Sequence, residues 1–341
     1  LTLLTREVAE QPGRALAELR GRIAEVRDLA GDQGRALPPA LDPEASLSAS
    51  LDALAVVARG ADMLGVVGLV EEIRSRPATA SYLDARQRGE RWLVRIDDLD
   101  VPRNMPGAEA AILKSLEAHS LHWDGSVVRQ SERLESYDAA LLTLEAAGHT
   151  FNCTCARKRL KGIGPYPGTC RQANRPPGDA AVRVRVDDQP IHFDDLVMGP
   201  TEETLSETSG DFIIRRRDGL IAYQLATAVD DGHPDITRVV RGVDLLDNTA
   251  RQLHLMRLLS LDRPAYGHVP MILNREGQKL SKQTHAPALD DTSPAANLRQ
   301  ILPMLGLTPG EALATPAELL EWASGAFNLT ALQGGPDSYR H

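Results

Sequence analysis

The segment "RWLVRIDDLD", residues 91–100, decides the fold class of this chain. It opens with apolar residues typical of a buried strand and closes on three acidic residues. Helical patterns stand on either side of it, at residues 80–89, which end in a glycine, and at residues 107–125. Strands that alternate with helices are typical of a doubly wound α/β domain, in which ligands bind at the carboxyl ends of strands. The acids of this segment therefore stand where that rule places a site.

The same alternation continues toward the C-terminus. The pattern predicts further helices at residues 136–148 and 247–261. Apolar runs predict strands at residues 180–186, 211–216, 221–231 and 237–242. The α/β region is expected to cover residues 78–288, followed by a short helical region at 289–341.

Residues 1–77 have a different character. Leu16, Leu19 and Ile23 recur at helical spacing, which predicts a helical segment. The region contains no histidine, no cysteine, no glycine-rich loop and no paired acids. A packing role is favoured over a catalytic one, and the segment's function is left open.

Composition limits the class of protein. The chain has 341 residues and a formal net charge of −9, which argues against a general polyanion binder but permits local basic patches. No run of 18 apolar residues occurs, so no membrane span is expected. The three cysteines cluster within residues 153–170, and this odd count favours thiolate ligands in a reducing cytoplasm over a disulfide framework.

The cysteine cluster predicts a metal site. Cys153, Cys155 and Cys170 would supply three of the four ligands that a tetrahedral zinc ion needs. The nearest candidate for the fourth place is Tyr166, with water or a distant histidine as alternatives. Three incidental thiols are the other interpretation.

Two further motifs carry chemistry. In "GQKLSKQTHAPAL", Lys279 and Lys282 flank a serine and could place mobile ammonium groups on a polyphosphate, stabilising the charge of leaving pyrophosphate. The alternative is a solvated loop. In "RIDDLDVPR", three acids lie between Arg95 and Arg103, and the alternative to a binding site is a self-neutralising salt-bridge network.

Taken in order, these motifs, the cysteine cluster, "RRRDGLIAYQLATAVDD", "VVRGVDLLDNTARQ" and "YGHVPMILNREGQKLSKQ" resemble glutamyl-Q tRNA(Asp) synthetases. These are shortened, class I relatives of the glutamyl-tRNA synthetases. The resemblance covers the chain from about Ala78 to the C-terminal helices. It implies a Rossmann-like catalytic core at residues 78–288 with a small zinc-bearing insertion at about 151–180.

The resemblance also implies roles for individual residues. "KLSKQ" is similar to the family's KMSKS-type loop, so Lys282 would contact ATP and Lys279 would assist catalysis. Tyr223 and Arg241 would hold glutamate, and Asp97, where the family usually has Glu, would bind the substrate ammonium. The four positions of the family's zinc site match Cys153, Cys155, Tyr166 and Cys170.

The implied activity has two steps. Glutamate attacks the α-phosphorus of Mg²⁺-bound ATP without help from tRNA, and the glutamyl group then passes to queuosine in the anticodon of tRNA(Asp). Only 59 residues (341 − 282) follow Lys282, too few for a separate anticodon-binding domain. The catalytic core of a monomer would therefore hold the RNA, with residues 156–161 and Arg215–Arg217 as candidate contacts. Ordinary solvated surface is the alternative for both basic runs.

One departure from the family is clear. The family's opening strand, its "RFAPSPTG"-like loop and its H-x-G signature have no match, and the first histidine is His119. Loss of that strand predicts unpaired strand edges. A descendant that has lost activation, a chimera or partial gene that begins at Leu1 instead of Met, and a site rebuilt by residues 1–76 all remain open. The contrasting hypothesis is a non-catalytic, zinc-containing tRNA-binding module.

Overall fold

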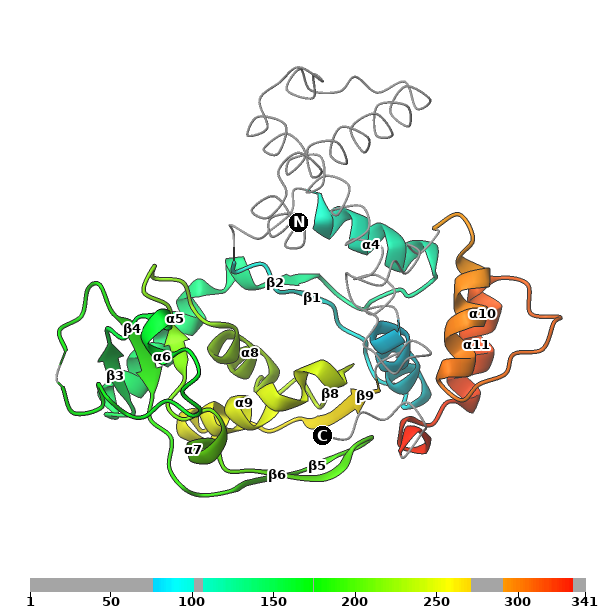
Figure 1. Ribbon diagram of the computed structural model, residues 1–341. Coiled ribbons are helices and arrows are strands. Elements are labelled where there is room, and N and C mark those ends of the chain that lie inside the picture. The colour runs from blue at the N-terminus through cyan, green and yellow to red at the C-terminus, as the bar shows by residue number, and fades with distance from the viewer. Residues whose placement is uncertain (1–75, 101–106, 174, 271–290, 334–341) are drawn as a thin grey trace, which may run out of the picture. The chain divides into compact units, whose positions relative to one another are not determined.

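The computed structural model describes residues 76–100, 107–173, 175–270 and 291–333 (Figure 1). All of them belong to one of the two compact units into which the chain divides. The predicted helices within residues 1–75, Arg103 and the loop with Lys279 and Lys282 lie outside the described residues. The expectations for them stay predictions.

The α/β alternation is confirmed by two parallel strand pairs. Strand β1 (Arg95–Ile96) pairs with β2 (Val128–Arg129), and helix α4 (Ala108–Ala118) lies between them in the chain. Strand β8 (Arg238–Gly242) pairs with β9 (Ala265–Val269) across helix α9 (Leu246–Leu259). Within the described part of the chain these pairs form two separate sheets.

Antiparallel structure surrounds the cysteine region. A three-stranded sheet has the order β3 (Thr150–Cys153), β4 (Ala181–Val184) and β7 (Ile213–Arg215), with the short helix α6 (Arg157–Leu160) between its first two strands in sequence. The predicted strands at 180–186 and 211–216 are therefore present. The hairpin of β5 (Ile191–Asp195) and β6 (Gly199–Glu203), which is followed by α7 (Leu205–Thr208), was not predicted.

One predicted strand is wrong. The segment 221–231 contains helix α8 (Tyr223–Asp231), not a strand. Its consecutive residues Leu225–Ala228 are all buried, because the helix packs against both α5 (Leu134–Ala146) and α9. The segment is short and mostly apolar, and its polar residues Thr227 and Asp231 are buried with the rest, so it resembles a buried strand although a helical spacing of polar residues is present.

Two hydrophobic clusters support these elements. One centres on α5, α8 and α9 and includes Val184 of β4 and Tyr266 of β9. The other joins the helical residues 76–87 to α10 (Pro294–Met304) and α11 (Pro316–Ala326). In Figure 1, α10 and α11 lie at the opposite end of this unit from β3 and β4. Three short 3-10 helices complete the described elements: η3 (Gln130–Glu132), η4 (Val243–Leu245) and η5 (Leu329–Leu332).

The helix before β1 is well integrated into this second cluster. Ala80 and Leu83 are fully buried, and the Arg76 guanidinium donates to the Met304 carbonyl at 2.7 Å. Gln87 donates to the Phe327 carbonyl. The prediction of a helix ending at Gly89 and of a helical C-terminal region is confirmed. In the part described, no helix is long and apolar enough to cross a bilayer.

Candidate active site and metal centre

Arg241 is held in a buried hydrogen-bond network at the end of the β8–β9 sheet. Its Nε–H donates to His268 Nε2 at 3.0 Å, and Nη2 donates to Thr249 Oγ1 at 2.8 Å and Gln252 Oε1 at 2.7 Å. Arg241 and His268 are register partners on adjacent strands, which places their side chains next to each other. Nη1 has a long contact of 3.9 Å with Asp231 Oδ2. The most open edge of this guanidinium is therefore the one that carries Nη1.

The acids of residues 97–100 are paired in the structure. Arg95 Nε donates to Asp97 Oδ1 at 2.6 Å, and its Nη1 donates to the buried Asp231. Asp98 accepts from Ser131, and Asp100 accepts from Arg216. These contacts agree with the alternative interpretation of the segment, a self-neutralising salt-bridge network. It also connects Asp97 to Arg241, because Arg95 and Asp231 lie between them as alternating charges.

Tyr266 lies among the residues predicted to hold glutamate. Burial raises its pKa, the Asp231 carboxylate and Tyr223 raise it further, and the positive charges of Arg241 and Arg95 lower it. The Arg241 guanidinium lies 5.0 Å from the Tyr266 ring centroid. Tyr223 is the first residue of α8 and is half-buried. Asp97 is thus linked to Arg241 through Arg95 and Asp231, and Tyr223 and Arg241 both influence the pKa of Tyr266.

Unpaired polar atoms surround Arg241. Within the described ranges, Tyr266 Oη, Gln252 Nε2 and Asp231 Oδ2 are buried and make no hydrogen bond. Leaving a buried polar atom without a partner costs about 1–3 kcal/mol. Such a group is expected where a polar ligand or water completes the bonding. This chemistry suits a zwitterionic amino acid, which brings carboxylate acceptors and an ammonium donor.

The cysteine cluster has the geometry of a zinc site. The three cysteine Sγ atoms lie within 4.8 Å of one another, and those of Cys155 and Cys170 are 3.6 Å apart. Tyr166 Oη lies 3.4 Å from Cys153 Sγ and 3.9 Å from Cys155 Sγ. A tetrahedral zinc with Zn–S bonds of about 2.3 Å separates its sulfurs by about 3.8 Å. The four side chains thus fit the ion, and Tyr166 fills the fourth place better than a distant histidine does.

Electrostatics at this cluster favour a thiolate. Burial raises the pKa of Cys170, but hydrogen bonds from the Thr154 backbone, Tyr166 and the other two cysteines outweigh it and lower the pKa to about 7. Burial and then the Cys153 sulfur raise the pKa of Tyr166. A bound divalent cation would lower the pKa of both groups, since it stabilises bound anions.

Tyr166 is fixed in place from three directions. Its backbone forms a bridge with Gly210, where an added Cβ would lie 2.5 Å from the Tyr166 nitrogen. The Arg183 guanidinium stacks on its ring at 3.9 Å from the centroid. The Cys170 N–H donates to its hydroxyl at 2.9 Å. The loop 154–170, which contains little regular structure, is thereby tied to the antiparallel sheet.

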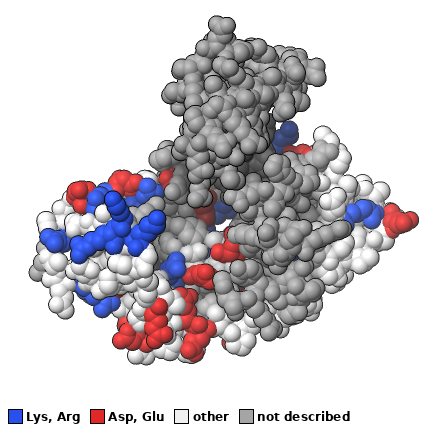
Figure 2. All heavy atoms as spheres, viewed as in Figure 1, with Lys and Arg blue, Asp and Glu red and all other residues white. Residues whose placement is uncertain are grey.

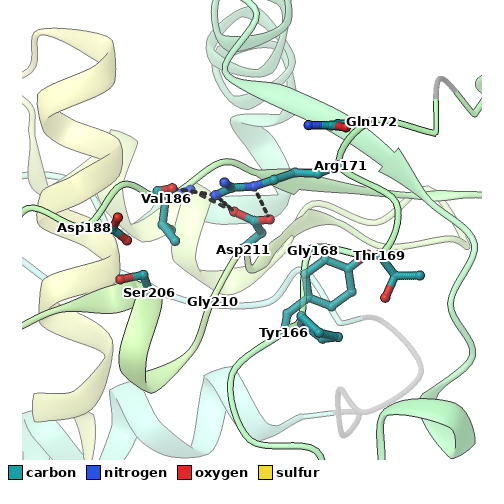
Figure 3. Close-up of a pocket in the computed structure, with 11 residues that line it drawn as sticks. Tyr166, Gly168, Thr169, Arg171, Gln172, Val186, Asp188, Ser206, Gly210 and Asp211 are labelled. Carbon is teal, nitrogen blue, oxygen red and sulfur yellow. Dashed lines mark hydrogen bonds and ion pairs between the residues drawn. The ribbon is translucent and has the colours of Figure 1, made fainter.

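A hollow of about 400 Å³ lies beside this loop (Figure 3). Its wall contains Tyr166 and a bidentate ion pair in which Arg171 donates to both oxygens of the buried Asp211, at 2.6 and 2.8 Å. Figure 3 shows this pair spanning the middle of the hollow, with Thr169 and Ser206 at its sides. Arg171 and Asp211 neutralise each other's charge. We therefore assign this ion pair a structural role rather than a ligand-binding one.

Basic side chains gather on the surface near the metal loop (Figure 2). Lys158, Arg159 and Lys161 of the predicted RNA contact are exposed. Arg217 is half-exposed and donates to the Thr154 carbonyl, whereas Arg215 is more enclosed and Arg216 pairs with Asp100 and Asp218. The run 156–161 is the freer of the two predicted basic surfaces.

Several site residues were not predicted. His268 and Tyr266 of β9 contact Arg241, Asp195 of β5 contacts His268, and Asp230 and Asp231 end α8. The signal for the last two was the acidic pair at the end of an apolar run. Asp195 and His268 carry no local signal, because 73 residues separate them in the chain.

Comparison with known proteins decides the family. A family model described as the catalytic domain of class I tRNA synthetases (E and Q) matches residues 74–164 and 167–311. A protein of Ectopseudomonas mendocina named glutamyl-Q tRNA(Asp) synthetase is 50% identical over 248 residues, which cover 72% of this chain and 84% of that protein. The chain belongs to the glutamyl-Q tRNA(Asp) synthetase family. It is therefore a ligase of the aminoacyl-tRNA synthetase type.

Other relatives with this name agree. One of Thiobacillus denitrificans is 52% identical over 259 residues, covering 72% of this chain and 85% of that protein. A solved glutamate–tRNA synthetase of Elizabethkingia anophelis aligns with a TM-score of 0.65 at 22% identity, covering 78% of this chain and 64% of that one. The chain thus spans slightly less than two thirds of that solved chain. This likeness shows the class I synthetase fold.

Proposed function

We propose that the chain activates L-glutamate with ATP and transfers the glutamyl group to queuosine in the anticodon of tRNA(Asp). The observation that carries the proposal is identity of about half the residues to proteins named for that activity, over 72–76% of this chain. The buried, polar surroundings of Arg241 support the amino-acid part of it.

Recognition of glutamate would be centred on Arg241. Its Nη1 edge offers charge-assisted hydrogen bonds to a carboxylate, and Tyr223 would add a hydroxyl contact. Asp97 would bind the substrate ammonium, in competition with its present partner Arg95. Asp97, Arg95, Asp231 and Arg241 form a series of alternating charges. The carboxylate of an incoming amino acid can pair with Arg241 and its ammonium with Asp97, while Arg95 and Asp231 stay paired with each other.

The chain's contribution to ATP activation would come from the lysine loop. Lys282, with Lys279, would neutralise charge on the polyphosphate, and Mg²⁺ bound to ATP shares that task. Both lysines stay predictions, since they lie outside the described residues.

Zinc would act structurally. Bound to Cys153, Cys155, Tyr166 and Cys170, it would join β3 to the loop that carries the basic run 156–161. We propose that this surface contacts tRNA(Asp), and that the protein acts as a monomer.

ATP–pyrophosphate exchange with glutamate, in the absence of tRNA, tests the activation step. We expect exchange in the full chain, a strong loss in Arg241→Lys, and little change in Arg238→Lys. Arg238 is a suitable control because it stands on the same strand but pairs with Asp84, away from the site. Absence of exchange in the unaltered chain would overturn the proposal.

The second candidate function is a zinc-containing tRNA-binding module that does not activate glutamate. Two observations favour it: the parallel strands form two separate sheets in the described part, and the sequence has no H-x-G signature before "SYLDAR". Binding of queuosine-containing tRNA(Asp) by a chain that gives no exchange would establish this module.

A further inference from the structure

A buried chain of hydrogen bonds runs behind Arg241. Asp195 Oδ2 and His268 Nδ1 are 2.6 Å apart, and the other nitrogen of that ring receives the Arg241 Nε–H. The side chains of Asp195 and His268 are both 0% exposed. The three residues come from β5, β9 and β8, three strands that meet at the site.

Backbone N–H groups fix the donor and acceptor of each hydrogen bond in the series from Asp195 through His268 to Arg241. Asp195 Oδ1 accepts the N–H groups of Val197 at 3.0 Å, Met198 at 2.8 Å and His268 at 3.1 Å, so this oxygen can only be an acceptor. Burial raises the pKa of Asp195, but His268 and the backbone hydrogen bonds lower it more, so the carboxylate is ionised. Its Oδ2 faces His268 Nδ1, which therefore carries the proton.

The His268 Nε2 atom is left as an acceptor, and it meets the Arg241 Nε–H at 3.0 Å and the Thr249 hydroxyl at 3.2 Å. Burial lowers the pKa of His268, which keeps the ring neutral at pH 7 and preserves this arrangement.

We propose that Asp195 and His268 are positioning residues that lock the Arg241 guanidinium, so that its Nη1 edge stays directed at the substrate carboxylate. The inference rests on the proposed role of Arg241 in glutamate binding. Without the ring, Nε would lose its acceptor, and the guanidinium would be held by hydrogen bonds only through Nη2, to Thr249 and Gln252. A guanidinium fixed before the ligand arrives loses less freedom on binding.

The substitution Asp195→Asn keeps the shape of the side chain but reverses the donor and acceptor roles in the Asp195–His268 hydrogen bond. The three backbone N–H groups hold the amide oxygen at the Oδ1 position, so the amide NH₂ faces His268 Nδ1. The ring must then carry its proton on Nε2, and two donors oppose each other at the 3.0 Å contact with Arg241. Asp194→Asn is the matched control, because Asp194 is the neighbouring residue on β5 but is exposed.

Two measurements on the full chain test this. Nitrogen-15 NMR of labelled histidine is expected to show the His268 proton on Nδ1 in the unaltered chain and in Asp194→Asn, and on Nε2 in Asp195→Asn. Calorimetry with L-glutamate is expected to show a dissociation constant raised about 10- to 100-fold in Asp195→Asn and unchanged in Asp194→Asn. In an Arg241→Lys background, which has no Nε to meet the ring, Asp195→Asn is expected to add no further loss.

The outcomes separate this inference from the proposed function. A folded Asp195→Asn variant that binds glutamate as the unaltered chain does would overturn the positioning role, and so would an equal further loss in the Arg241→Lys background. If the unaltered chain binds no glutamate, the proposed function fails. The NMR measurement of which His268 nitrogen carries the proton then tests, independently of glutamate, whether His268 accepts from Arg241. A proton on Nε2 in the unaltered chain refutes the lock even if Asp195→Asn does not fold.

Discussion

At the residue scale, Gly210 shows how one backbone position controls a predicted metal ligand. Its φ is +62°, and an added Cβ would lie 2.5 Å from the Tyr166 nitrogen and 2.7 Å from its carbonyl oxygen. Gly210→Ala is therefore expected to push Tyr166 away from the three sulfurs and to lower the zinc content of the purified protein. Gly148→Ala is the control, because Gly148 also has a positive φ of +72° but has nothing within 4 Å of the added atom. Equal zinc content in the two variants would contradict the prediction.

His254 makes a second prediction at this scale, about pH. Its Nε2 contacts the Arg185 carbonyl at 2.8 Å and its Nδ1 contacts Arg257 Nη2 at 3.1 Å, so the neutral ring with the proton on Nε2 satisfies both. Burial lowers its pKa from the ordinary 6.5. Below that pH the unfolded chain binds a proton that the folded chain excludes, and stability falls as the pH falls, by up to about 1.4 kcal/mol per pH unit.

The measurement is urea unfolding of the unaltered chain and of His254→Gln at pH 7.5, 6.5 and 5.5. Trp92, Trp123 and Trp322 are the chain's three tryptophans and all lie in the described unit, so their fluorescence reports on it. The stability advantage of the unaltered chain is expected to shrink toward pH 5.5, because glutamine does not titrate. A constant difference across this range would show that His254 keeps its ordinary pKa.

What the sequence predicts well at this scale is chemistry held within a short segment. The cysteines and Tyr166 lie within 18 residues, and the structure places all four side chains together. Asp195 and His268 lie far apart in the chain, and only the packing of the β5–β6 hairpin on β9 makes them neighbours. A tertiary contact of that kind leaves no periodic signal in the sequence.

At the element scale, the error at α8 has a physical reason and a consequence. The polar residues Gln224, Thr227 and Asp231 of this helix recur at helical spacing, but Thr227 and Asp231 are buried, so the stripe does not mark a solvent-facing side. The two C-terminal acids of α8 both lie near Arg95, Asp230 by a longer contact of 3.7 Å. Their other partners differ, since Asp231 approaches Arg241, whereas Asp230 accepts hydrogen bonds from α5 and η3. Alternating strands and helices were predictable because their solvent-facing sides remain polar.

The contacts of Asp230 predict how firmly α5 and α8 are joined. Its carboxylate accepts from Tyr137 at 2.8 Å, Gln130 at 3.0 Å and Arg133 at 2.7 Å. Tyr137→Phe removes one of these donors and is expected to cost about 1 kcal/mol of unfolding free energy, because the other two remain. Asp230→Ala leaves a partly buried arginine and a buried glutamine without their partner, and is expected to cost about 3–5 kcal/mol.

Urea unfolding followed by tryptophan fluorescence measures both changes. Thr143→Ala serves as the control on α5, because its hydroxyl bonds within its own helix on the exposed side. If Asp230→Ala costs no more than Tyr137→Phe, the carboxylate is not the joint between these helices.

At the scale of the whole molecule, the family match and the fold agree on where the recognisable synthetase begins. The match starts at residue 74, and the helical residues 76–87 are packed against α10 and α11 as a native part of the unit. The parallel strands downstream nevertheless form two separate pairs in the described residues. The chain thus belongs to the family although its described parallel strands do not form one continuous sheet. Pyrophosphate exchange is the direct measure of activation, which the family name alone does not supply.

The separation between the zinc loop and the rest of the unit leads to a last prediction. The loop 154–170 is held by the cysteine cluster and by the Tyr166–Gly210 bridge, whereas β8, β9 and α9 are held by the hydrophobic cluster around Leu253, Leu255 and Met256. Removing zinc with a chelator is therefore expected to speed amide hydrogen exchange in residues 150–186 and to leave α9 protected. Cys153→Ser should reproduce this pattern without a chelator. Because the basic run 156–161 lies on that loop, tRNA(Asp) binding should weaken in the same variant while glutamate binding is unchanged. Equal acceleration of exchange in α9 would show that the metal supports the whole unit.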